Sequence, residues 1–352
     1  MVSCIKNYLA KNAHSGKHNG GLTGRYLARY IKSVVTILFP LTIVVMTPIH
    51  FAHSEQISFN KTPLENDVQL SYKWRDHANE KHQFSFTLPL EQVKNRHHKR
   101  FVPEQVTRYQ QIAMLKERKK IDAKDARIEI KRIGESLQLS VRSRSEEQVK
   151  KYQKQLLQAK DDAFEQYLED HYYTQFSNYL GQEGIKPDHL RYIKENQTLL
   201  KPFAEAMYAE ASESPDMRAF LNLLLGWLQS IPYDDLESRV SSNGAGFSPP
   251  FTLLSNNQGD CDSKSVLMAS VIRALFPDIE LVMLYLPNHA LLGIAMSPQK
   301  DEASMLINGE EYLLMEPTGP ALFSLNEVAP SSQRFLDTRM YSYEVIPFHV
   351  NK

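Results

Sequence analysis

The chain has 352 residues, of which 42% are hydrophobic and 23% charged, which is typical of a globular protein of about two domains. Its 41 basic and 41 acidic residues cancel, so overall charge gives no attraction to nucleic acid and we expect no nucleic-acid partner. The only cysteines are Cys4 and Cys261, which excludes a framework of several disulfides.

The first 54 residues contain no Asp or Glu, and their basic residues precede an apolar run at 33–51. Basic residues before an apolar stretch stay on the cytoplasmic side of a membrane, so we expect the rest of the chain to be exported. The run approaches the roughly 20 residues that span a bilayer, although Pro40 and Pro48 interrupt it. We therefore favour a single-pass anchor in the inner membrane with a periplasmic body. The alternatives are a signal peptide cleaved near residues 52–54, which would leave a secreted or periplasmic protein, and a buried helix of the soluble fold.

Residues 55–200 have the pattern of a mixed strand and helix region of unknown role. Apolar residues alternate with polar ones over 68–74 and 84–88, as in half-buried strands. A similar alternation on both sides of Gly134 predicts a hairpin. Ser145 begins a capping-box sequence, which predicts a helix from there to about Tyr173.

The segment 94–132 is strongly basic, with 13 basic and 5 acidic residues. One interpretation is a surface that contacts anionic partners such as lipid headgroups or anionic polymers, and the other is an ordinary solvated helical face. His97 and His98 have no metal-ligand spacing to other His or Cys residues, so we expect them at the surface and expect no metal site. The next segment, from Asp188 to Ser230, has a helical pattern that we expect Pro202 and Pro215 to break.

Cys261 is the first candidate catalytic residue. Gly259 and Asp260 predict a turn before it, and an apolar pattern after it predicts a helix that ends before Pro277. Cys261 should therefore lie at a helix N-terminus, where the helix dipole lowers the pKa of a thiol. The reactive form of a nucleophilic cysteine is the thiolate. The alternative is a buried, inert cysteine.

His289 and Glu316 are candidate partners of this thiol. His289 begins an apolar strand, and Glu316 ends a strand that follows an Asn308-Gly309 hairpin turn. His289 would take the thiol proton and return it to a leaving amine, while Glu316 would orient the imidazole. The alternatives are a structural core histidine and a surface carboxylate.

The stretch from about Leu228 to Gly319 resembles the transglutaminase-like superfamily of papain-like thiol enzymes, in particular bacterial transglutaminase-like cysteine peptidases. The motifs that carry the resemblance are Ile231-Pro232-Tyr233, Gly259-Asp260-Cys261-Asp262, His289-Ala290 and Glu316-Pro317-Thr318. Many members have Asp where Glu316 stands, and an aromatic residue often occupies the position of Leu291.

The resemblance implies an α+β fold in which the helix that begins at Cys261 packs on an antiparallel sheet. We expect three regions: a basic N-terminus with a membrane segment at 1–54, the mixed region at 55–200, and a transglutaminase-like catalytic domain at 201–352. The second oxyanion-hole donor, beside the Cys261 backbone N–H, would be Gln229, Tyr233 or Gln258. Gln229 is favoured because papain-like sites often use an upstream Gln, and the alternative for each is a hydrogen-bonded structural role.

The expected function is acyl transfer at an amide through a Cys261 thioester, without a cofactor. Water as acceptor makes the enzyme a peptidase or amidase, which is our default, and an amine acceptor makes it a transglutaminase. The substrate would be a protein or peptide. The alternative from another class is a catalytically silent binding module in the cell envelope. A metal-dependent hydrolase is not indicated, because the sequence contains no H-E-x-x-H or paired-Cys motif.

Overall fold

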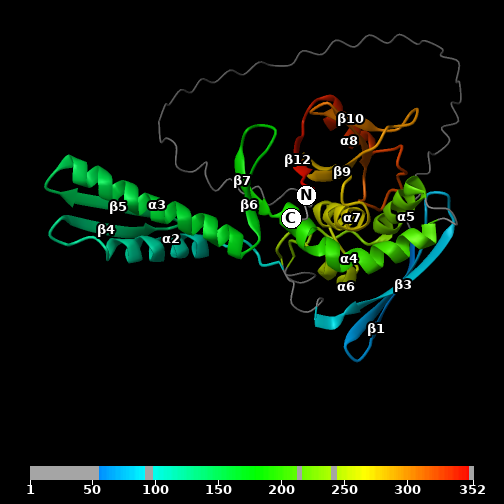
Figure 1. Cartoon of the computed structure of the whole chain (residues 1–352), viewed down its shortest axis with the longest axis horizontal. Helices are drawn as coiled ribbons and strands as arrows, with labels where there is room; N and C mark the ends of the chain where they lie inside the picture. The colour runs from blue at the N-terminus through cyan, green and yellow to red at the C-terminus, as the bar shows by residue number, and fades with distance from the viewer. Residues whose placement is uncertain (1–54, 92–97, 212–215, 239–243, 349–352) are drawn as a thin grey trace, which may run out of the picture.

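The computed structural model describes residues 55–91, 98–211, 216–238 and 244–348. These residues form a body and a long arm that projects from one side of it (Figure 1). The expected anchor or signal segment, residues 1–54, lies outside the described residues. Within the described ranges, no helix has both the length and the apolar character needed to cross a membrane.

The body begins with an antiparallel sheet in the order β1–β2–β3. Its strands are β1 (Glu55–Pro63), β2 (Asp67–Arg75) and β3 (Lys81–Pro89). The alternation in the sequence predicted β2 and β3 correctly, with Leu70 opposite Phe86 and Tyr72 opposite Phe84. These four side chains are buried in the same core as the helices of the body, so the N-terminal sheet packs directly on the candidate catalytic region.

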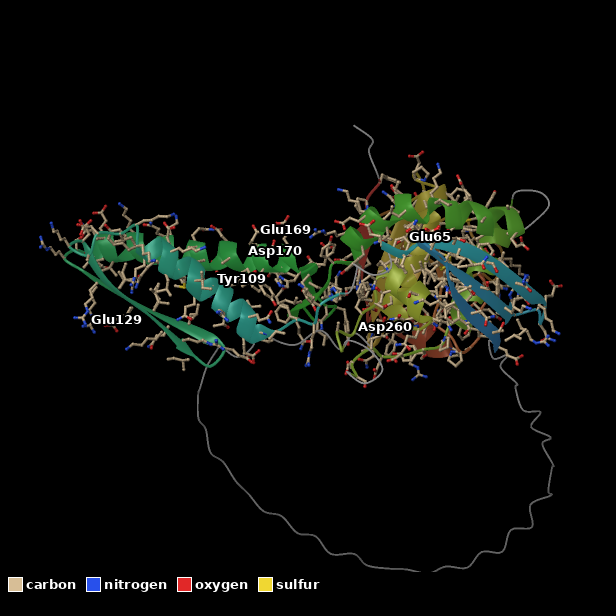
Figure 2. All side chains as sticks on the ribbon, turned by 90° about the horizontal axis from the view of Figure 1, so that it is seen from below. Glu65, Tyr109, Glu129, Glu169, Asp170 and Asp260 are labelled. Carbon is tan, nitrogen blue, oxygen red and sulfur yellow. The ribbon has the colours of Figure 1, made fainter. Side chains whose placement is uncertain are left out.

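The arm consists of two antiparallel helices packed against a β-hairpin (Figure 1). Its elements are α2 (Pro103–Arg118), β4 (Ala126–Ile133), β5 (Ser136–Ser143) and α3 (Glu146–Asp170). The predicted hairpin at Gly134 and the predicted cap are confirmed: the Ser145 side chain accepts a hydrogen bond from the Gln148 N–H at 3.2 Å. The arm has a small core of its own, and its polar side chains extend into solvent, with Glu129 near the far end in Figure 2. Most of the basic segment 94–132 therefore lies on the arm.

A hairpin of β6 (Tyr173–Ser177) and β7 (Glu183–Pro187), which the sequence pattern did not predict, follows α3. The body helices come next: α4 (His189–Ala211), α5 (Met217–Ser230), α6 (Pro250–Asn256) and α7 (Cys261–Leu275).

The expected break at Pro202 is wrong, because α4 continues through it. A proline inside a helix costs about 3 kcal/mol. Burial of Leu200, Phe203 and Met207 in the body core offsets this, since each such side chain contributes about 1.5–3 kcal/mol. Helix α4 also crosses residue 200, the boundary expected between two regions, while Pro215 lies outside the described residues.

The second sheet of the body is antiparallel, in the order β10–β11–β9–β8–β12. Its strands are β8 (Leu281–Leu286), β9 (His289–Ala295), β10 (Ser304–Ile307), β11 (Glu310–Met315) and β12 (Ser342–Ile346). One face packs on α7 and the main core, and the other face packs near α8 (Pro330–Asp337). Antiparallel sheets combined with packed helices confirm the predicted α+β class.

The expectation that His98 lies at the surface is wrong. Its ring is buried between Tyr173, Tyr192 and Phe247, and its Nδ1 lies 2.9 Å from the Tyr192 hydroxyl. Burial lowers the pKa of His98 to about 3, so the ring is neutral at ordinary pH. His97 lies outside the described residues.

Candidate active site

Cys261 is the first residue of α7, as the sequence predicted. The Asp260 side chain caps this helix by accepting a hydrogen bond from the Ser263 N–H at 3.0 Å. The preceding turn is held from the other side, because the Gly259 N–H donates to the Pro232 carbonyl at 3.3 Å. The position of the thiol is therefore set by a capped helix and a fixed turn.

His289 and Glu316 meet at one end of the sheet. His289 begins β9 and Glu316 directly follows β11, and these strands are antiparallel neighbours. The His289 Nε2 lies 2.9 Å from the Glu316 Oε1, while the Glu316 Oε2 accepts a hydrogen bond from the Ala329 N–H at 2.8 Å. The second contact holds the carboxylate in place, so the carboxylate can hold the imidazole.

Helix α7 packs against β9, the strand that begins at His289. Burial raises the pKa of Asp262, and the nearby charge of His289 opposes that rise. His289 is therefore close enough to interact with the residue that follows Cys261. His289 and Glu316 are thus in contact with each other, and their link to Cys261 runs through Asp262, the next residue of the helix.

The Cys261 thiol is buried, and its pKa is shifted in the opposite direction from the one that the sequence predicted. Cys261 is only 1% exposed, and its Sγ donates to the Asp262 Oδ1 at 3.5 Å. Burial raises the pKa of the Cys261 thiol, and the charges of Asp262 and Asp260 raise it further. The expected lowering by the helix dipole is thus wrong for this closed site. A helix terminus contributes about 0.3–1 kcal/mol, whereas a unit charge about 4 Å away contributes roughly 4 kcal/mol near a protein surface.

Gln229, the favoured oxyanion donor, has a structural role. Its Nε2 donates to the Glu316 and Phe323 carbonyls, each at 2.9 Å, and its Oε1 accepts from the Phe323 N–H at 3.3 Å. Both amide hydrogens are therefore used to tie α5 to the segment that carries Glu316. The alternative interpretation, a hydrogen-bonded structural residue, is the one that the geometry favours.

Tyr233 and Gln258 lie on the two segments that form the turn before Cys261. Tyr233 pairs with Gly259 in an isolated parallel bridge and is about half exposed, at 47%. Burial raises the pKa of Tyr233 to about 12, and the neighbouring Cys261 contributes to this rise. Tyr233 is therefore a candidate oxyanion donor that lies near the thiol and has an accessible side chain. Gln258 is half-buried.

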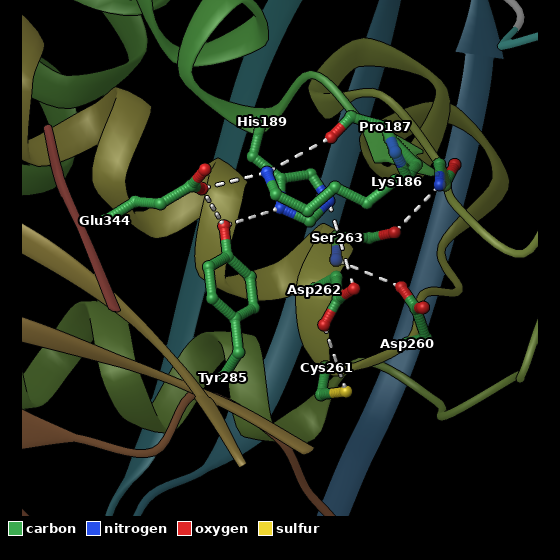
Figure 3. A network of polar contacts seen from close by, with 10 residues as sticks. Lys186, Pro187, His189, Asp260, Cys261, Asp262, Ser263, Tyr285 and Glu344 are labelled. Atoms are coloured by element: carbon green, nitrogen blue, oxygen red, sulfur yellow. Dashed lines mark hydrogen bonds and ion pairs between the residues drawn. The ribbon is translucent and has the colours of Figure 1, made fainter. Parts of the chain in front are cut away.

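Four residues that sequence reasoning did not assign to the site extend it on the side of Asp262 (Figure 3). They are His189, Tyr285, Glu344 and Lys186. The His189 Nε2 lies 3.8 Å from the Asp262 Oδ2, and its Nδ1 lies 3.0 Å from the Tyr285 hydroxyl. Tyr285 in turn donates to Glu344, which pairs with Lys186. The Gly-Asp-Cys-Asp sequence drew attention to Asp262, but no local pattern marked the other four.

Two cavities lined by described residues lie away from Cys261. One of about 590 Å³ is lined by residues of α4 and of the segment that ends at Phe348, and one of about 370 Å³ lies between α3 and Arg191. Among the described residues, Asp76, Glu80 and His82 form a group with metal-ligand atoms within 4.8 Å of one another. The Asp76 carboxylate there already accepts from His82 and from the Glu80 N–H, so this group is explained without a metal.

No family model matches the chain, and comparison with curated proteins and with solved structures likewise gives no match.

Proposed function

We propose that the chain is a cysteine-dependent acyl-transfer enzyme with a transglutaminase-like, papain-like core. The observation that carries the proposal is the His289–Glu316 contact of 2.9 Å, at the end of a sheet packed on the helix that begins with Cys261. Thiol catalysis needs an imidazole oriented by a carboxylate and a thiol at a helix terminus, and the chain has these groups on a strand and a helix that pack against each other.

The contact with Glu316 determines which nitrogen of the His289 imidazole can act as the base. The Nε2–H of His289 donates to Glu316, so Nδ1 is the nitrogen that takes the Cys261 proton. The thiolate attacks the amide carbonyl carbon, and the imidazolium then gives its proton to the leaving amine as the C–N bond breaks. Water adds to the resulting thioester and releases the acid, which restores the thiol. An amine in place of water gives transamidation, and hydrolysis of a protein or peptide remains our default.

The oxyanion of the tetrahedral intermediate needs two donors. The backbone N–H of Cys261 at the start of α7 is one, as expected from the sequence. We assign the second to the Tyr233 hydroxyl in place of Gln229, because Gln229 uses both amide hydrogens on backbone carbonyls.

Location and partners remain proposals from the sequence. The acid-free basic N-terminus and the apolar run at 33–51 support an exported or membrane-anchored enzyme with a periplasmic body. A peptide or protein of the cell envelope is the substrate class that fits this location. The basic residues of 94–132 would contact anionic surfaces from the arm.

A second candidate function is a catalytically silent binding module of the same fold. The burial of Cys261 and the two neighbouring carboxylates favour it, because they hold the thiol protonated. For catalysis, the closed site must open to expose the thiol, and the His289 imidazolium must offset the carboxylate charges.

Thiol alkylation separates the two functions. Iodoacetamide is added to the full-length chain at several pH values, and the adduct at Cys261 is read by peptide mass spectrometry, apart from Cys4. An enzyme shows alkylation of Cys261 below pH 7 that falls at least tenfold in His289→Ala. A thiol that reacts only above its ordinary pKa of about 8.5, with no dependence on His289, supports the silent module.

A further inference from the structure

The residues behind Asp262 form a buried relay that contains a second imidazole (Figure 3). His189 begins α4 and is fully buried, with its Nδ1 on Tyr285 and its Nε2 toward Asp262. This imidazole is distinct from His289, whose charge also acts on Asp262. Asp262 therefore lies between two histidines, and its other oxygen contacts the Cys261 thiol.

The hydrogen-bond geometry determines which nitrogen of His189 carries its proton. The oxygens of Tyr285 and Glu344 are 2.6 Å apart, so a proton must lie between them, and Tyr285 has one hydroxyl proton to give. The Tyr285 oxygen can then only accept from His189, which requires a proton on Nδ1. The Lys186 Nζ lies 2.8 Å from the Glu344 Oε2, and this ion pair holds the carboxylate in place.

A neutral His189 in this tautomer presents the lone pair of Nε2 to Asp262. Within the described residues this nitrogen has no hydrogen-bond partner. An ionised Asp262 would place a second acceptor 3.8 Å away, and two buried acceptors that face each other are unfavourable. One proton between the two groups removes that conflict.

The surroundings favour uncharged forms of both groups. Burial lowers the pKa of His189, assisted by the charge of Lys186, and burial raises the pKa of Asp262. With one proton, the pair of His189 and Asp262 carries no net charge, whichever of the two groups holds the proton. The titratable and charged groups that face the pair are Lys186, Tyr285, Glu344, Asp260, His289 and His98.

We propose that His189 is a positioning residue for Cys261. His189 shares one proton with Asp262, and this removes the negative charge that would otherwise face the Cys261 thiolate. The proposal rests on the proposed function, since it matters only if Cys261 must become a thiolate. The proposal accounts for the other contacts of the relay. The ion pair of Lys186 and Glu344 fixes the position of Tyr285. Tyr285 in turn fixes the tautomer of His189, and His189 keeps Asp262 neutral.

The test is a double-mutant comparison in the full-length chain, with the pH profile of Cys261 alkylation by iodoacetamide as the readout. In His189→Gln, the amide N–H stabilises an ionised Asp262, and we expect alkylation at pH 7 to slow by about tenfold. In Asp262→Asn the charge is absent, so adding His189→Gln should change the rate less than twofold. Equal slowing in both backgrounds, or no slowing in the first, overturns the proposal.

Two further measurements keep the test decisive. Asp262→Asn alone should match the wild type at acidic pH and react faster on the alkaline side, where the wild-type pair loses its proton. An unchanged profile overturns the proposal even if His189→Gln does not fold. His82→Gln is the matched control, because His82 also lies against a carboxylate, that of Asp76 at 2.8 Å, is outside the relay, and should leave the profile unaltered. Failure of the proposed function is recognised separately, by an absent effect of His289→Ala.

Discussion

Glu316→Gln is the substitution that tests the candidate catalytic pair most directly. The carboxylate accepts two hydrogen bonds, from the His289 Nε2 at 2.9 Å and from the Ala329 N–H at 2.8 Å. Glutamine keeps the shape but has one oxygen and one NH2 group, so one of these two donors must face another donor. If the oxygen of the new glutamine keeps the hydrogen bond from the Ala329 N–H, its NH2 group faces His289. His289 must then accept a hydrogen bond at Nε2 and carry its own proton on Nδ1. That nitrogen is then unable to take the thiol proton.

The size of the effect follows from the loss of one hydrogen bond to a charged group. Such bonds contribute about 1.5–3 kcal/mol. The His289 and Glu316 side chains are 20% and 6% exposed, so solvent screens the interaction only in part. Since about 1.4 kcal/mol corresponds to a factor of ten, the thiolate–imidazolium form should decrease by about 10-fold to 150-fold.

The assay is alkylation of Cys261 by iodoacetamide in the full-length chain between pH 5 and pH 9. We expect the rate constant below pH 7 to fall by that factor in Glu316→Gln. Glu280→Gln is the control, because the Glu280 carboxylate also accepts from a partner in this sheet, the Tyr312 hydroxyl at 2.8 Å, and does not contact His289. Identical profiles for Glu316→Gln and the wild type would refute the assigned role of Glu316.

Two predictions concern stability, measured by chemical denaturation. A Cβ added at Gly319 would lie 1.9 Å from the Gln229 carbonyl oxygen, so Gly319→Ala should lower the free energy of unfolding by more than about 3 kcal/mol. Gly134→Ala, where the space is open but φ is +59°, should lower it by only about 1–2 kcal/mol. Burial lowers the pKa of Lys264 from 10.5 to about 7, so the unfolded chain binds more protons above pH 7 and stability rises with pH. Between pH 7 and pH 9 the free energy of unfolding should rise by about 2 kcal/mol more in the wild type than in Lys264→Met.

Each of these has an outcome that contradicts it. Similar destabilisation by the two glycine substitutions would mean that the close approach of Gly319 to α5 is relieved without strain. Parallel pH curves for the wild type and Lys264→Met would mean that the Lys264 ammonium is not affected by its burial.

The local parts of the fold could be predicted from the sequence because they depend on neighbouring residues. The Ser145 cap, the Asn308-Gly309 turn and the alternation in β2 each involve residues a few positions apart. The start of α7 at Cys261 belongs to the same group, since Asp260 and Ser263 form its cap.

The predictions that were wrong or missing depend on contacts between distant parts of the chain. Pro202 is tolerated because α4 is buried on the body, which no local pattern reports. The relay needs His189 to meet Tyr285, 96 residues away, across α4 and the second sheet. The raised pKa of Cys261 likewise results from complete burial of the thiol, whereas the sequence showed only its position at a helix terminus.

The burial of Cys261 has a consequence for the lifetime of the protein. Oxidation of cysteine to sulfenic, sulfinic and sulfonic acids begins from an exposed thiolate, and the last two steps are essentially irreversible. A thiol that is 1% exposed and protonated in the resting state reacts slowly with peroxide. The burial that restrains the Cys261 thiol therefore also preserves it, so that each molecule keeps an intact sulfur as long as the site stays closed.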